Sequence, residues 1–194
     1  MKKTFLLFFL LLFANCAKAE IISNEKIDKI KVQKAETIML NLYNEVKNQT
    51  QKGHEPYGAI ILDKNGKLIS SGFDSVIINN STIDHASILA IKNAQEQFKT
   101  YDLSQYGLSL YITSEPCAMC VSAIMQSGIK NVYFGMSAKE IKKLIGINIY
   151  THKNWMKEFK KHNIAVYGNI EPKIGEKILY EYIGSGGVSS KDLY

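Results

Sequence analysis

The most constraining feature of this sequence is a short cysteine motif placed between two predicted strands. Residues 108–113 form an apolar run typical of a strand, and Ser114-Glu115-Pro116 ends it. Cys117-Ala118-Met119-Cys120 then opens a predicted helix that ends at Gly128, before another strand at 131–135. A strand, a helix and a strand in this order form a crossover between two parallel strands. The chain is therefore expected to build part of a parallel sheet, with both cysteines at the start of the crossover helix.

The other predicted elements surround this crossover. They are an amphipathic helix at 24–52, strands at 57–62 and 68–72, an irregular segment at 73–82, a helix at 84–98 with Asp84 as its cap, helical or mixed structure at 139–162, a strand at 164–168 and a helix at 173–183. The Asn65-Gly66 pair between the first two strands is a hairpin signal. The fold class is therefore α/β, with a mixed sheet covered on both faces.

The first 19 residues have the pattern of an export signal. Two lysines open the segment, residues 4–14 are mostly Phe and Leu, and Ala17-Lys18-Ala19 fits a cleavage site before Glu20. The apolar run is too short to span a bilayer comfortably. We therefore expect an exported protein, periplasmic or secreted, with no stable membrane span after cleavage.

This interpretation divides the chain into a signal peptide at 1–19, one domain at 20–183 and a flexible Gly-rich tail at 184–194. Two alternatives remain for the N-terminus: a buried helix, or a lipoprotein anchored through Cys16. Phe13-Ala14-Asn15 before that cysteine is a poor lipidation motif. Soluble export is therefore the preferred interpretation.

The basic residues of the chain are all lysines. There are 24 of them and no arginine, and loss of residues 1–19 removes three lysines and no acid, which lowers the formal charge from +6 to +3. Without arginine, the chain lacks the bidentate donors that recognise phosphate and guanine. A nucleic-acid partner is therefore not expected, although the lysines could still contact phosphate.

Three residues of zinc-binding type lie at two predicted helix starts. His85 falls in the first turn of one helix, and Cys117 and Cys120 lie one turn apart at the start of another. One histidine and a Cys-x-x-Cys pair supply three zinc ligands and leave a fourth position for water, as in catalytic zinc sites. A disulfide or redox pair is the competing interpretation, but it gives no role to His85 or to the Glu-Pro before Cys117.

With these motifs in place, the chain resembles the cytidine and deoxycytidylate deaminase superfamily, nearest its bacterial guanine deaminase and tRNA adenosine deaminase branch. The matching motifs are Pro56-Tyr57-Gly58-Ala59, Gly72-Phe73-Asp74, His85-Ala86 with the helix that follows, and the run from Leu110 to Gly135. The resemblance implies a three-layer α/β/α sandwich around a five-stranded mixed sheet. It also implies assembly as a homodimer or larger homo-oligomer.

The same resemblance implies the chemistry of the site. Zinc would be held by His85, Cys117 and Cys120, and zinc-bound water would release an exocyclic amine of a nucleobase or nucleoside as ammonia. The residues expected to bind the substrate are Asp74, Ala59, Ala86 and Glu115.

Two positions depart from the family pattern. Ser87 stands where the family has the Glu that carries protons, and Asp74 stands where it has Asn. Serine has no useful pKa near neutrality, so we expect a zinc hydrolase whose activity is weak or lost. The alternative is an inactive pseudo-enzyme that keeps zinc and binds a base-like ligand or a protein partner. Other acids near the motifs, Glu55 among them, are interpreted as structural or solvated.

Overall fold

The computed structural model describes residues 31–146, 148–151 and 153–187. The chain forms two compact units, Met1–Thr37 and Ile38–Tyr194, and the described part of the first is helical. The predicted signal peptide and the last seven residues of the predicted tail lie outside the described residues. In the part of the chain that is described, no helix is both long enough and apolar enough to cross a membrane.

The second unit contains the strands and helices that form the candidate site. In chain order they are a helix at 38–50, β1 (Gly58–Leu62), β2 (Leu68–Phe73), α2 (Val76–Asn79), α3 (Ala86–Phe98), a short 3-10 turn (Ser104–Tyr106), β3 (Ser109–Ser114), α4 (Ala118–Ser127), β4 (Asn131–Met136), α5 (Ala138–Ile145), α6 (Trp155–Lys161), β5 (Ala165–Tyr167) and α7 (Pro172–Gly184). The segment at 73–82, predicted to be irregular, contains the short helix α2.

The strands form one mixed sheet in the order β2-β1-β3-β4-β5. β1 pairs antiparallel with both β2 and β3, whereas β3, β4 and β5 run parallel. The connection from β3 through α4 to β4 is the crossover that the cysteine motif predicted. The predicted α/β class with a five-stranded mixed sheet is therefore confirmed.

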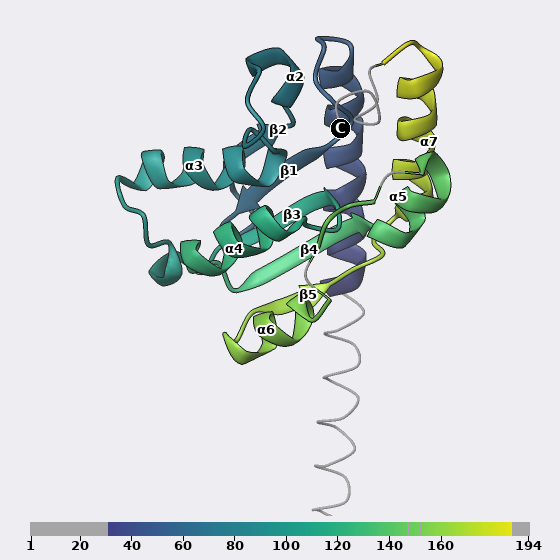
Figure 1. The fold of residues 1–194 in the computed structure, drawn as a ribbon. Coiled ribbons are helices and arrows are strands. Elements are labelled where there is room, and N and C mark those ends of the chain that lie inside the picture. Colours follow the sequence, from purple (N-terminus) through teal and green to yellow (C-terminus); the bar gives the residue numbers. More distant parts are fainter. Residues whose placement is uncertain (1–30, 147, 152, 188–194) are drawn as a thin grey trace, which may run out of the picture. The chain divides into compact units, whose positions relative to one another are not determined.

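Side chains alternate between the two faces of this sheet. On one face, Ile61, Leu110 and Val132 join a buried cluster with residues of α3, α4 and α6. On the other face, the Tyr43 hydroxyl of the helix at 38–50 donates to the Thr113 carbonyl oxygen at 3.1 Å. Figure 1 shows α3 and α4 lying together on one side of the sheet. Helices therefore cover both faces of the sheet, and the candidate metal ligands lie near the ends of the strands, where α3 and α4 begin.

The close packing of α3 on β2 fixes where α3 begins. A Cβ atom at Gly72 would collide with backbone atoms of Ala86 and Ala90, so only glycine allows the helix to come this near. The Ser70 hydroxyl also donates to the Ala90 carbonyl oxygen at 2.8 Å. The end of β2 therefore lies directly against the first turn of α3, which follows His85.

Candidate metal centre

The three candidate metal ligands lie at the N-termini of two helices. His85 is the N-cap residue of α3 and Cys117 is the N-cap residue of α4, and neither side chain caps its helix. Cys120 lies one turn into α4. The prediction that Asp84 caps α3 was wrong, since its carboxylate accepts instead from Asn79 Nδ2 at 2.7 Å. Both N-cap side chains are consequently free to turn toward each other.

The distances within this group fit a zinc ion. His85 Nδ1 lies 3.7 Å from Cys117 Sγ and 3.8 Å from Cys120 Sγ, and the two sulfur atoms are 3.4 Å apart. Zinc bonds of ordinary length at tetrahedral angles place N and S about 3.6 Å apart and two S atoms about 3.8 Å apart. Among the described residues, these three form the group that could hold a metal ion. They therefore fit a zinc site with three protein ligands.

The pKa values of Cys117, Cys120 and His85 favour the binding of a cation. Hydrogen bonding from the Cys120 thiol, with a further contribution from His85, lowers the pKa of Cys117 to about 4 although burial opposes this. Sharing that hydrogen bond, together with burial, raises the pKa of Cys120. The pKa of His85 is raised, mainly by its hydrogen bond with Cys117. One thiolate is thus already formed, and the remaining protons are those that a metal ion displaces.

Ser87, the residue at the position of the family's proton carrier, lies beside this group. The residue is only 3% exposed in the first turn of α3. Its hydroxyl donates a hydrogen bond to the Cys120 sulfur, which lowers the pKa of that thiol. Ser87 therefore stabilises a ligand in its thiolate form, and a hydroxyl in this position has no acidic proton to offer near neutrality.

A pair of buried carboxyl groups lies close to the metal ligands. Glu55 and Asp74 are 7% and 6% exposed, and their side chains are hydrogen-bonded to each other. A hydrogen bond between two carboxyl groups requires a proton on one of them. Burial, followed by the hydrogen bond and the charge of Asp74, raises the pKa of Glu55 to about 8. The pair therefore holds a proton at neutral pH.

The strand pairing brings these two acids together. Gly58 of β1 lies opposite Phe73 of β2, so the residues that flank this end of the hairpin meet. The Glu55 amide donates to the Asp74 carbonyl oxygen at 3.3 Å, and the Asp74 amide donates to the Tyr57 carbonyl oxygen at 3.0 Å. The acid pair is therefore built into the end of the hairpin formed by β1 and β2.

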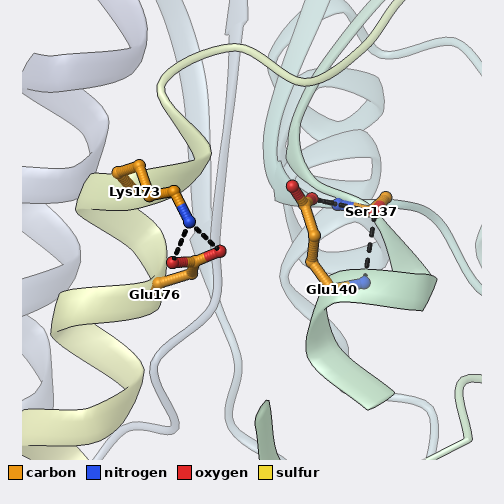
Figure 2. A network of polar contacts seen from close by, with 4 residues as sticks. All are labelled: Ser137, Glu140, Lys173 and Glu176. Carbon is orange, nitrogen blue, oxygen red and sulfur yellow. Dashed lines mark hydrogen bonds and ion pairs between the residues drawn. The ribbon is translucent and has the colours of Figure 1, made fainter. Parts of the chain in front are cut away.

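Glu115, predicted to bind substrate, has both carboxylate oxygens engaged. Oε2 accepts from the Ala138 amide at 2.9 Å and Oε1 accepts from Trp155 Nε1 at 2.9 Å. The same end of α5 carries a capping box between Ser137 and Glu140, which Figure 2 shows beside the Lys173–Glu176 ion pair of α7. Glu115 thus ties the segment before Cys117 to α5 and α6, and its contact with substrate stays a prediction.

The remaining predicted residues are found in or near the same region. Ala59 and Ala86 are buried in the core cluster of the sheet face that α3 covers, and their role toward substrate stays a prediction. Sequence reasoning set Glu55 aside and missed Tyr57 and Tyr182, whose pKa values are raised by burial and by the charges of the acid pair. The sequence placed Glu55 just before the strand β1 but gave no signal that it pairs with Asp74. Tyr182 lies in α7, far from any motif, and had none.

The family of the chain follows from its sequence match. The model of the cytidine and deoxycytidylate deaminase zinc-binding region matches residues 32–136, which is more than half of the chain. The protein belongs to this family, as its motifs had indicated.

Individual relatives agree with this assignment. A tRNA-specific adenosine deaminase of Buchnera aphidicola subsp. Schizaphis graminum is 41% identical over 115 residues, which cover 58% of this chain and 74% of the relative. One of Rickettsia bellii is 39% identical over 87 residues, which cover 44% of this chain and only 59% of the relative. The guanine deaminase from Nitrosomonas europaea is 25% identical, with a TM-score of 0.73 over 77% of this chain and 84% of that one. The predicted cytidine deaminase-like architecture is thereby confirmed.

The buried acid pair predicts an unusual dependence of stability on pH. Because the pKa of Glu55 is about 8 in the folded protein and its ordinary value is 4.5, the folded state holds this proton more tightly than the unfolded state. The resulting stability is present below pH 4.5 and is lost as the pH rises through 8. The free energy of unfolding of the metal-free protein, measured with urea, should therefore fall between pH 5 and pH 8. In Glu55→Gln this fall should be smaller by on the order of 2–4 kcal/mol.

The matched control is Glu96→Gln, which removes an exposed acid of α3 that lies 3.9 Å from Lys92 Nζ. This variant should keep the decline of the unmodified protein, since exposed ion pairs contribute little. Equal declines in Glu55→Gln and the unmodified protein would show that the pair holds no proton.

Proposed function

We propose that this protein is a zinc-dependent hydrolase that releases an exocyclic amine of a purine-type nucleobase or nucleoside as ammonia. One observation carries the proposal: His85 Nδ1, Cys117 Sγ and Cys120 Sγ converge at zinc-ligand distances in a chain of the deaminase family. The relatives named above are tRNA-specific adenosine deaminases and a guanine deaminase, and both names refer to a purine amine, which supports this substrate class.

The residues of the chain have distinct parts in this function. A zinc ion in the site supplies Lewis-acid activation of the attacking water. Cys117 and Cys120 bind as thiolates, and the Ser87 hydroxyl donates to the Cys120 sulfur. Asp74 is buried beside the centre, where its carboxyl group is placed to hydrogen-bond to the edge of a base.

Turnover is slow in this proposal because position 87 carries no acid. A positioned acid or base is worth about 10²–10⁴-fold in rate, and a hydroxyl that donates to a metal ligand does not supply it. A slow enzyme agrees with the intact ligand set and the altered proton-carrier position together.

The test is ammonia release by the zinc-loaded protein from guanine, adenine and their nucleosides. Ser87→Glu should raise kcat/KM by about 10-fold or more on the preferred substrate, because it places a carboxyl where the family has one. Ser87→Gln is the matched control, since it has the same size but carries no acid, and it should show no increase. Zinc content and a thermal melt establish that both variants are loaded and folded.

Absence of ammonia from every substrate, with both the unmodified protein and folded, zinc-loaded Ser87→Glu, would contradict the proposal. Saturable binding of a base under those conditions would favour the pseudo-enzyme alternative.

The proposal extends to export and to assembly as a homodimer. Export is supported by the pattern of residues 1–19, and the homodimer by the resemblance to a family whose members assemble in this way. Mass spectrometry of the mature chain should find Glu20 as its first residue. A mature chain that begins at Met1, or at a lipidated Cys16, would contradict soluble export.

A further inference from the structure

The loss of an acid at position 87 coincides with an additional acid elsewhere in the site. Ser87 is buried and is occupied by its hydrogen bond to the Cys120 sulfur. Glu55 is equally enclosed and shares a hydrogen bond with Asp74, yet neither carboxyl is paired with a lysine among the ion pairs of the described residues. Burying two carboxyl groups in this way is unfavourable unless they share a proton.

The pair is coupled to the metal centre through the backbone. The Ser75 amide, next to Asp74, donates to the carbonyl oxygen of Asp84, next to His85, at 3.0 Å. This hydrogen bond fixes the segment that carries Asp74 against the segment that carries His85. The charges of both acids also contribute to the raised pKa of His85. The pair therefore lies within electrostatic reach of the metal ligands without being one of them.

We propose that the Glu55–Asp74 pair carries the proton of the deamination reaction, in place of the acid that is missing at position 87. The inference rests on the proposed function. In the reaction, the pair takes one proton from the attacking water and gives one to the leaving amine. A carbon–oxygen bond forms, the carbon–nitrogen bond breaks and ammonia leaves. The second water proton stays with the product, and the pair ends with the single proton that it had at the start.

The surroundings of the pair suit this task. Burial and the neighbouring carboxyl raise the pKa of Glu55 to about 8, so its proton is present but transferable near neutrality. The groups around it are Asp74, His85, Tyr57 and Tyr182 of α7. His54 lies at the outer side, where its Nδ1 contacts the Ser75 hydroxyl and the Asp74 carbonyl oxygen at 3.1 Å each.

The experiment compares four zinc-loaded proteins: the unmodified chain, Glu55→Gln, Ser87→Glu, and the double variant with both changes. Glu55→Gln should lower kcat of the unmodified chain by about 100-fold or more. In the Ser87→Glu background, Glu55→Gln should lower kcat by less than about 10-fold, because the carboxyl at position 87 then carries the proton. Asp74→Asn should also lower kcat, since it removes the carboxyl that raises the pKa of Glu55. Zinc content should remain unchanged in all of them.

A spectroscopic measurement separates proton carriage from a purely structural role. The infrared spectrum of the zinc-loaded protein at pH 7 should contain the carbonyl stretch of a protonated carboxylic acid, and Glu55→Gln should lack it. The band should disappear as the pH rises through about 8, and kcat should fall over the same range.

Each other outcome overturns the inference. Unchanged kcat in Glu55→Gln, equal losses in both backgrounds, or absence of the infrared band would show that the pair carries no proton for the reaction. Turnover by Ser87→Glu with none by the unmodified chain would overturn the inference and leave the proposed function standing. No turnover by either would overturn both.

Discussion

The candidate site depends on the meeting of two helix N-termini beside one sheet. His85 and Cys117 are the residues that precede the first turns of α3 and α4, and their side chains point toward a common centre. A helix N-terminus carries partial positive charge and lowers the pKa of a thiol placed there. The parallel pairing of β3 and β4 and the close contact of α3 with Gly72 hold the two starts in place. The metal-binding geometry is therefore a property of the fold and not of one flexible loop.

The hairpin formed by β1 and β2 places a pair of buried carboxyl groups beside the candidate metal ligands. Its antiparallel register joins Glu55 to Asp74, and the hydrogen bond from Ser75 to Asp84 fixes that end beside the metal ligands. A buried pair of carboxyl groups lowers stability near neutral pH, which is a cost commonly accepted at functional sites. In the proposal above, the buried Glu55–Asp74 pair at the ends of β1 and β2 carries the proton that the hydroxyl of Ser87 cannot carry.

Much of the fold could be predicted from the sequence, because the period of apolar residues and the crossover around the cysteine motif constrain it strongly. The grouping of His85, Cys117 and Cys120 as candidate metal ligands was also predictable, since a histidine and a Cys-x-x-Cys pair at two helix starts are typical of a zinc site. The role of Glu55 was not predictable from the sequence, because an acid before a strand resembles any solvated acid. Only the pairing of β1 with β2 places Glu55 next to Asp74. The cap of α3 was wrong for a similar reason: Asp84 has a local partner in Asn79, which short-range rules do not foresee. The contribution of Tyr182 arises from tertiary packing alone.

In the zinc-loaded protein, His85, Cys117 and Cys120 should form a three-ligand zinc centre with one open coordination position. X-ray absorption at the zinc edge of the purified, zinc-loaded protein measures this coordination. We expect two sulfur atoms at about 2.3 Å, one nitrogen at about 2.0–2.1 Å and one further light atom from solvent. A centre with four protein ligands, or a spectrum without two sulfur neighbours, would show that the three residues do not form such a site.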